Sequence, residues 1–315
     1  MQPILRLGLA IVFGCVFCCE VQARPVAAFR GPPPAAQHLL RSHTVIVGKI
    51  TAIEANTVEA EPYPNTTRKV RYQVAVIEII DRIKGADGLT TLRLGYVAAA
   101  QPSPVKSGPG PVPVPPGKQP IQQIRPVVPK PIPRYQVPAP KIEKGLEGIF
   151  FLKPHHKESF YVAPMAYDVV PKANNRTYAS EVERLKRCAK ILQAPKQYLK
   201  SKTTSERLLA ASLLLAQYNT PPEGAKQVRR VPIDDREESQ AILEAIASAD
   251  WKNWRKIDPA TGLSPVMLFG ELRLSPKDGW NPRFRNYLTE FPVAAQKWLK
   301  EHANSYRVHR WVADQ

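Results

Sequence analysis

Cys188 is the only thiol outside the N-terminal segment of this 315-residue chain, and so the first candidate for a nucleophile. It lies beside the apolar stripe of a predicted helix, next to Ala189 and Ile191. A small thiol in such a place packs like a hydrophobic side chain and is seldom reactive. We therefore expect Cys188 to be buried and inert.

His155 and His156 form the only pair of adjacent histidines, the residue type most often found as a metal ligand. Lys153 and Lys157 lie close on either side, and their positive charge opposes the binding of a metal cation. The pair also falls in a predicted turn between two strands. The sequence therefore predicts a solvated turn here and no metal site.

Acidic side chains crowd residues 234–238, at the start of a predicted helix. Carboxylates at this position complement the positive end of the helix dipole, which accounts for them without a catalytic role. Outside the N-terminal segment the sequence has no HExxH, GxSxG, P-loop or paired CxxC motif. We therefore assign no catalytic, cofactor-binding or metal-binding residue, and a protein that is not an enzyme is favoured.

The N-terminal segment has the features of an export signal. Arg6 precedes an apolar run over residues 7–19, and small residues follow up to Ala23. This order is typical of a signal peptide (residues 1–23) cleaved after Ala23, with cleavage after Ala28 as an alternative. A transmembrane anchor fits less well, because the run is shorter than the ~20 residues that span a bilayer. A lipoprotein signal at one of the leader cysteines also fits less well. We expect a periplasmic or extracellular protein with no transmembrane span after cleavage.

The formal net charge of +18 lies outside the predicted leader, in which Arg6 is balanced by Glu20. A basic exported protein meets acidic polysaccharides, cell-wall polymers and lipid headgroups before it meets nucleic acid. We therefore expect the partner to be an anionic envelope polymer or another exported protein, and not nucleic acid. Three of the four cysteines lie in the leader, so we expect no disulfide within the mature chain.

Residues 70–85 form the longest run whose pattern fits only one kind of secondary structure. Val70, Tyr72, Val74 and Ile80 share one face, while the opposite face is polar at first and becomes apolar from Ala75. Alternation with a period of two predicts a strand. A strand whose burial changes along its length is typical of a strongly bent barrel or sandwich.

Further segments show strand patterns in the first half of the chain. They are residues 44–54, in which Gly48 allows a bend, and residues 89–97, 146–152, 159–163 and 167–170. The segments are short and mostly connected as hairpins. They predict an OB-like antiparallel barrel or a small sandwich over residues 38–175, preceded by a flexible segment at residues 24–37.

The order of these segments resembles a known family. VIVGKITAIE, YQVAVIEIIDRIKG, TLRLGYV, GIFFL and FYV are similar in order to the strands of the netrin-like OB fold, which is related to tissue inhibitors of metalloproteinases and found in exported bacterial proteins. The resemblance implies a binding module. The eukaryotic inhibitors of that superfamily act through a cysteine at the mature N-terminus, where this chain has Arg24 or Phe29, so their mechanism is not carried over.

A proline-rich insertion at residues 99–144 separates the third predicted strand from the fourth. Its composition is typical of an extended polyproline II or disordered segment. A solvated insertion without a partner is the simpler hypothesis, because the free energy of loop closure grows slowly with length. The alternative is a basic arm that docks on an aromatic groove or a polyanion. The candidate contacts to an anionic partner are Lys106, Lys118, Arg125, Lys130, Arg134 and Lys141.

In residues 176–315 the apolar side chains recur at helical spacing. A helix starts near Tyr178, where Ser180 and Glu183 predict a capping box. Two more helices are predicted over residues 205–218 and 237–249. The region is expected to form a separate helical domain, which loosely resembles HEAT-like repeats but has no fixed period.

Prolines predict where two later helices start. Ser264 followed by Pro265 starts a short helix, and a further helix is expected to start at residues 281–282 and to be interrupted at Pro292. Residues 306–312 alternate like a strand. All five tryptophans lie in this last third of the chain, and we expect them to anchor helix packing rather than to stack on a ligand.

These patterns predict an α+β fold: an N-terminal OB-like antiparallel β-barrel with a long proline-rich insertion, followed by a separate α-helical domain. The favoured function is that of an exported, non-enzymatic binding protein whose recognition face lies on the barrel. Two alternatives stay open. One is an envelope hydrolase with a site where the two domains meet, and the other is a scaffold that acts through the proline-rich basic arm.

Overall fold

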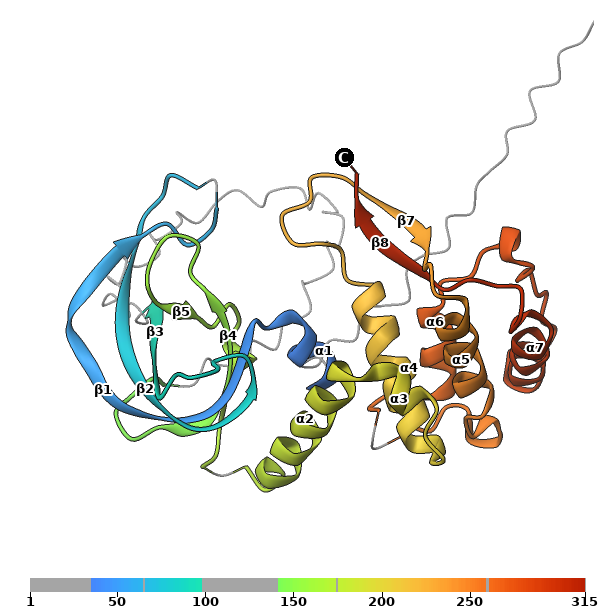
Figure 1. The fold of residues 1–315 in the computed structure, drawn as a ribbon, viewed down its shortest axis with the longest axis horizontal. Coiled ribbons are helices and arrows are strands. Elements are labelled where there is room, and N and C mark those ends of the chain that lie inside the picture. The colour runs from blue at the N-terminus through green and yellow to red at the C-terminus, as the bar shows by residue number, and fades with distance from the viewer. Residues whose placement is uncertain (1–34, 65, 98–140, 174, 259–260, 315) are drawn as a thin grey trace, which may run out of the picture. The chain divides into compact units, whose positions relative to one another are not determined.

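A computed structural model describes residues 35–64, 66–97, 141–173, 175–258 and 261–314. In these ranges the chain forms a six-stranded sheet, a two-stranded sheet and seven α-helices. Strands dominate the first part of the chain and helices the second, so the fold class is α+β, as predicted (Figure 1). None of the described helices is both long enough and apolar enough to cross a membrane.

The six-stranded sheet consists of segments with two-residue apolar spacing. Its strands are β1 (Thr44–Ala60), β2 (Val70–Lys84), β3 (Thr91–Val97), β4 (Glu147–Pro154), β5 (Tyr161–Val162) and β6 (Val169–Pro171). β1 pairs antiparallel with both β2 and β4, β2 pairs antiparallel with β3, and β5 pairs parallel with β3 and antiparallel with β4. The pairings therefore run from β1 through β2, β3, β5 and β4 back to β1, and β6 also pairs with β4. The predicted pairing of residues 44–54 with residues 70–84 is confirmed, and Figure 1 shows both strands curving strongly.

Glycine lets β1 bend at the point where it pairs on both sides. Gly48 lies opposite Ile79 of β2 and Gly148 of β4. A Cβ atom on Gly48 would lie 2.4 Å from Ile77 Cγ2 and 2.9 Å from the carbonyl oxygen of Glu78. The register of β1 against β2 also shifts next to Gly48. The bend expected at this position therefore depends on the absence of a side chain.

The buried face of β2 changes along the strand, as its sequence pattern predicts. Tyr72 and Val74 pack with Phe160 on one face, whereas Ala75 and other odd-numbered residues pack in the sheet interior on the other. Ile80 was expected to share the buried face of Val74, but it is 56% exposed. The prediction fails at Ile80 because the small cluster around Phe160 covers only the first part of that face.

The second part of the chain consists of helices and a terminal hairpin. The α-helices are α1 (Ala35–Arg41), α2 (Tyr178–Gln193), α3 (Pro195–Leu199), α4 (Thr204–Tyr218), α5 (Arg236–Ala247), α6 (Pro265–Glu271) and α7 (Tyr287–His302), where α1 precedes the sheet. The hairpin pairs β7 (Val228–Pro232) with β8 (His309–Ala313), and the 3₁₀ turns are η1 (Ala166–Asp168), η2 (Trp251–Asn253) and η3 (Pro276–Asp278). The apolar run of α4 is buried from Leu208 to Leu215, in agreement with the buried helix predicted there.

α2 starts at Tyr178, as predicted, but the capping box predicted for it is wrong, and so is the predicted start of α7. Thr177 is the N-cap of α2, and Ser180 lies inside the helix, where its Oγ donates to the carbonyl oxygen of Thr177 at 2.8 Å instead of forming a capping box. α7 starts at Tyr287 and not near residue 281, because the Asn286 side chain accepts a hydrogen bond from Leu288 N at 3.0 Å and caps the helix there.

The helix α7 also continues through a proline that was expected to interrupt it. Pro292 lies inside α7. Phe291 just before it and Ala295, Trp298 and Leu299 after it are all buried on the same helix. Packing on both sides of Pro292 therefore outweighs the loss of one backbone hydrogen bond.

Three described elements were not predicted. α1 starts at Ala35, so the segment expected to be flexible up to residue 37 is helical in its last three residues. α3 is a single short turn that starts with Pro195, and β7 is a five-residue strand paired with β8. All three elements are short, so their sequences show too few periodic residues to predict them, and contacts with other segments stabilise them.

One hydrophobic cluster joins the sheet to the helices. Val45, Ile149 and Phe151 of the sheet belong to the same buried cluster as Leu185 of α2 and Leu209 of α4. The predicted boundary at residue 175 falls in the chain between β6 and α2. Independent folding of the two parts stays a prediction, and a shared cluster of this kind favours their unfolding as one unit.

Candidate functional site

Two loops of the sheet meet and form one surface. Residues 61–64 and 66–69 connect β1 to β2, and residues 155–160 connect β4 to β5. We call these two segments the loop surface. The His155 Nε2 atom lies 2.9 Å from the carbonyl oxygen of Glu61, and Lys157 Nζ lies 2.7 Å from Glu61 Oε2. Two hairpins that are distant in sequence are therefore held together by side chains of the second.

His155 holds the loop surface together from the inside. Its Nδ1 accepts hydrogen bonds from the backbone N–H groups of Lys157 at 3.2 Å and Glu158 at 3.0 Å. These bonds assign the proton of the neutral ring to Nε2, which donates to Glu61. The ring packs against Tyr72 and Phe160, with centroids 5.6 Å and 4.9 Å away. The prediction of a solvated turn is wrong for His155, which is only 7% exposed.

The substitution His155→Ala tests this structural role. It removes three hydrogen bonds to partly buried backbone groups and the packing of a buried ring against Tyr72 and Phe160, so we expect the free energy of unfolding to fall by about 2 kcal/mol. Lys157→Ala is the matched control, because it removes only an exposed ion pair to Glu61 and should change stability by less than about 1 kcal/mol. Urea unfolding of both variants measures the difference, and equal losses would contradict the structural role of His155.

The outer side of the loop surface presents polar and aromatic groups. The Glu61 carboxylate accepts a hydrogen bond from the Lys157 ammonium, and this bond holds the pKa of Glu61 below its ordinary value. His156 Nε2 lies 4.0 Å from the same carboxylate. Tyr63 is 64% exposed, and its carbonyl oxygen accepts a hydrogen bond from Thr66 Oγ1 at 2.9 Å. The surface therefore presents an aromatic ring, a histidine and a cation, groups of the kind that contact ligands in binding sites.

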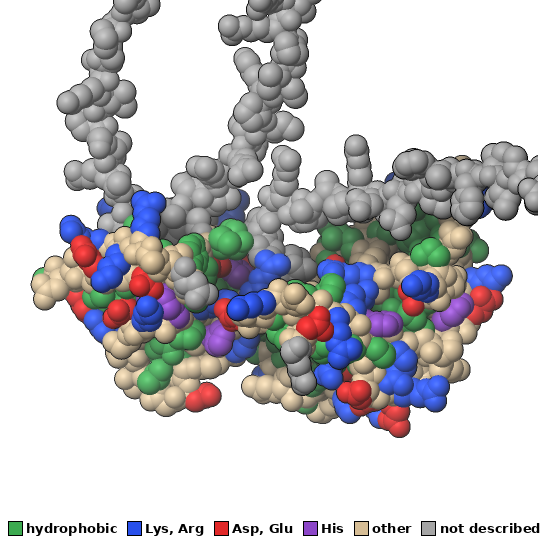
Figure 2. Space-filling view, turned by 90° about the horizontal axis from the view of Figure 1, so that it is seen from above, with side chains coloured by type: hydrophobic (Ala, Val, Ile, Leu, Met, Phe, Trp, Pro, Cys, Tyr) green, Lys and Arg blue, Asp and Glu red, His purple; other side chains and the backbone are tan. Residues whose placement is uncertain are grey.

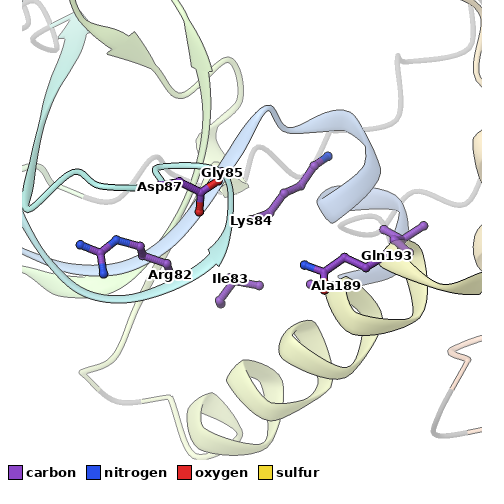
Figure 3. A pocket seen from close by; sticks show the side chains of 8 residues that line it. Arg82, Ile83, Lys84, Gly85, Asp87, Ala189 and Gln193 are labelled. Carbon is purple, nitrogen blue, oxygen red and sulfur yellow. The ribbon is translucent and has the colours of Figure 1, made fainter.

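A cavity of about 360 Å³ lies between the end of β2 and α2 (Figure 3). Lys84 lines it but extends toward α1, where its Nζ donates to the carbonyl oxygens of Leu39 at 3.0 Å and Ser42 at 2.6 Å. Burial lowers the pKa of Lys84. Arg82 donates to the carbonyl of Leu89, and Asp87 is the carboxylate of the described lining. Arg82 and Lys84 therefore both donate hydrogen bonds to backbone carbonyl oxygens. No observation in this cavity favours hydrolysis over binding.

A larger hollow of about 740 Å³ lies along α2 beside Leu209. Arg184 and Arg187 line it, and each lies near a carboxylate: Arg184 is 4.0 Å from Glu181, and Arg187 is 3.2 Å from Glu206. Both arginines of this hollow therefore already have a carboxylate nearby. In the described ranges of the chain, no three or more His, Cys, Asp or Glu side chains are grouped so that they could hold a metal ion.

Most of the predicted partner contacts lie outside the described residues. These are Lys106, Lys118, Arg125, Lys130 and Arg134, together with the predicted cleavage site at Ala23. Lys141 is described: its side chain is 84% exposed, and its Nζ lies 2.7 Å from Glu143 Oε2. That hydrogen bond raises the pKa of Lys141. The structure therefore places one of the six predicted contacts, and places it in an exposed ion pair.

Cys188 is buried on α2, as predicted. Burial raises the pKa of its thiol to about 11, from the ordinary value of 9.0. The thiol form therefore stabilises the fold below pH 9, and this contribution is lost as the pH rises through 11. We expect alkylation of Cys188 at pH 8 to be about 100-fold slower in the folded chain than in urea. Mass spectrometry of the peptide containing Cys188 measures both rates, and similar rates would contradict its burial.

Sequence reasoning missed a buried polar pair, His38 and Asp168. His38 Nε2 on α1 lies 2.5 Å from Asp168 Oδ1, and both side chains are 8% exposed. The His38 ring stacks on Phe151 with centroids 3.7 Å apart, and Asp168 Oδ2 accepts from Met165 N at 2.6 Å. These residues are far apart in the chain, and no local pattern links them. The pair ties α1 to the chain beside β6.

Residues 24–174 carry a formal net charge of +10 and residues 175–315 one of +8, so positive charge lies in both parts of the chain. From residue 175 onward the sequence has 24 Lys and Arg against 16 Asp and Glu. Seen from above, Lys and Arg side chains lie on the surface of both parts of the chain (Figure 2). Comparison of the chain with models of protein families, with curated proteins and with solved structures gives no match.

Proposed function

We propose that this chain is an exported, non-enzymatic binding protein, that its sheet is an OB-like barrel, and that the loop surface of the barrel is its recognition face. The partner we propose is an anionic envelope polymer, with another exported protein as the alternative. The observation that carries the proposal is the meeting of the β1–β2 and β4–β5 loops on a base fixed by His155.

The strand pairing supports an OB-like barrel. The OB fold is a five-stranded Greek-key barrel that binds ligands on the face of its second and third strands and on the loops that follow its first and fourth strands. Here the pairings return from β4 to β1, and β5 is parallel to β3. The loop surface consists of the two loops that correspond to the binding loops of that fold. This likeness in topology supports a binding role, as does the predicted resemblance to the netrin-like family.

The charge of the proline-rich insertion supports an anionic partner. The insertion follows β3, which ends at Val97, and Val97 pairs with Tyr72 beside the loop surface. We propose that the insertion supplies cations to a partner bound there. The proposed contacts are Lys106, Lys118, Arg125, Lys130, Arg134 and Lys141. Such contacts are long-range and screened by salt, so binding through them should weaken as the ionic strength rises.

Retention on immobilised dextran sulfate, with dextran as the neutral control, tests the proposal. We expect retention that falls with salt, and a loss of about tenfold in Arg68→Ala/Lys69→Ala, which removes two exposed cations of the loop surface. Lys200→Ala/Lys202→Ala removes two exposed cations of the helical part and should lose less than about twofold. Equal losses would show that only net charge matters, and the recognition face would then not lie on the loops.

Deletion of residues 99–140 distinguishes the scaffold alternative from the proposed binding role of the loop surface. If the insertion supplies cations to the loop surface, the deletion weakens retention on dextran sulfate together with capture of partners from an envelope fraction. If the insertion acts as a separate scaffold arm, the deletion abolishes capture of other exported proteins and leaves retention on dextran sulfate unchanged. The export part of the proposal is checked by sequencing the N-terminus of the chain recovered from secreting cells, which we expect to start just after Ala23.

A further inference from the structure

The helical part carries a second exposed surface, between η2 and the start of α7. Trp254 packs edge-on against Tyr287 with ring centroids 5.8 Å apart, and Phe284 packs edge-on against Tyr287 at 5.5 Å. The guanidinium of Arg255 lies over the Trp254 ring, 4.6 Å from its centroid. We call this cluster and the first turn of α7 the aromatic–arginine surface.

Exposed apolar side chains gather in this part of the chain. Among the described residues from 175 onward, the large hydrophobic side chains that are exposed are Ile257, Tyr287, Leu288 and Val293. Leu288 is 53% exposed and Val293 is 66% exposed, both within the first turns of α7. Val293 lies about 140° from Leu288 around α7, so it does not share its face. Tyr287 and Leu288 adjoin the exposed Arg283 and Arg285 in sequence, and apolar and cationic side chains that are exposed together are typical of an interaction surface.

The cations around this surface have no carboxylate partner among the described residues. Arg255, Arg283 and Arg285 are exposed and form no ion pair in that part of the chain. The carboxylates nearest in sequence to Arg283 and Arg285 are bonded to backbone groups instead. Glu290 accepts from Arg285 N at 3.0 Å, and Asp278 accepts from Ser275 N at 2.8 Å. These carboxylates complement helix starts, so the exposed guanidinium groups stay free for another anion.

We propose that the aromatic–arginine surface docks on an anionic lipid surface. Trp254 is buried and supports the exposed Tyr287 ring from within the chain. Exposed Tyr rings and aliphatic side chains such as Leu288 enter the boundary between headgroups and acyl chains, while Lys and Arg contact acidic headgroups. A water-soluble polyanion would neutralise the guanidinium groups but would leave Tyr287 and Leu288 in water. The apolar and cationic groups together therefore fit a lipid surface better than a polymer. This site is separate from the loop surface and does not depend on the proposed function.

Sedimentation with vesicles tests this proposal, with the chain recovered from secreting cells so that all variants share one N-terminus. The vesicles contain phosphatidylcholine alone or phosphatidylcholine with phosphatidylglycerol. We expect binding only to the second kind. Arg283→Glu/Arg285→Glu should weaken it by at least about tenfold, and Leu288→Ser by about fivefold. The matched variants are Lys200→Glu/Lys202→Glu, with the same change in net charge, and Ile80→Ser, which alters an exposed apolar residue of β2.

The outcomes separate the proposal from its rivals. It is supported if both variants of the aromatic–arginine surface lose binding while both matched variants keep it. It is overturned if the two charge reversals lose binding equally, since net charge alone would then explain the result. It is also overturned if Leu288→Ser binds like the unchanged chain, or if the Arg283→Glu/Arg285→Glu variant loses retention on dextran sulfate to the same extent, because the surface would then bind polyanions in general. Circular dichroism of each variant checks that the helices are retained.

Discussion

The substitution His38→Ala is expected to lower the free energy of unfolding by about 3–5 kcal/mol. It removes the ring that lies 2.5 Å from Asp168 Oδ1 and stacks on Phe151. The Asp168 carboxylate would then stay buried with one hydrogen bond, from Met165 N. A buried carboxylate that loses its partner is strongly destabilising, because its desolvation is no longer offset. Urea or thermal unfolding of the purified variant measures the loss.

An exposed pair of the same kind provides the control. His43 Nε2 lies 3.4 Å from Glu223 Oε2, but these side chains are 57% and 68% exposed. His43→Ala should therefore change stability by less than about 1 kcal/mol. The double variant His38→Ala/Asp168→Ala should recover part of the loss, since no carboxylate stays buried. A His38→Ala variant as stable as His43→Ala would show that the buried pair does not hold α1 in place.

The substitution Gly48→Ala is expected to have the second largest effect, a loss of about 3 kcal/mol. The new Cβ would lie 2.4 Å from Ile77 Cγ2 and 2.9 Å from the Glu78 carbonyl oxygen. Backbone cannot move away as a flexible side chain can, so β1 would have to separate from β2 at the point where it also pairs with β4. The free energy of unfolding from urea titration measures the effect.

Gly270 gives the matched control for Gly48. It lies inside α6, and a Cβ there would meet nothing within 4 Å. Gly270→Ala should therefore raise stability by about 0.5–1 kcal/mol, because alanine restricts the unfolded chain and favours the helix. If Gly48→Ala were as stable as Gly270→Ala, the close approach of β1 and β2 in the structure would be wrong.

Local periodicity explains which parts of the fold the sequence could predict. The alternation in residues 70–84 and the apolar run of α4 are properties of neighbouring residues, and both elements lie where they were expected. Helix starts were harder, because Asn286 and not residue 281 provides the cap of α7. β7 was missed because a five-residue strand is stabilised by its pairing with β8, which no local pattern reports.

The candidate site was less predictable than the fold. His155 was noticed for its chemistry, but its burial depends on Tyr72 and on the carbonyl of Glu61, which come from another hairpin. The pair of His38 and Asp168 likewise forms only when α1 meets the chain beside β6. Contacts between distant segments depend on the order in which the strands pair. Here β5 pairs with both β3 and β4, and no local sequence pattern predicts these pairings.

Hydrogen exchange of the full chain, with and without dextran sulfate, tests the role of the loop surface most directly. Binding at this surface should slow exchange of backbone amides in residues 61–64, 66–69 and 155–160, and the slowing should fade as salt is added. The same experiment on Arg68→Ala/Lys69→Ala should show little change on addition of dextran sulfate. Slower exchange confined to the helical residues from 175 onward, with the loops unaffected, would contradict a recognition face on the loop surface.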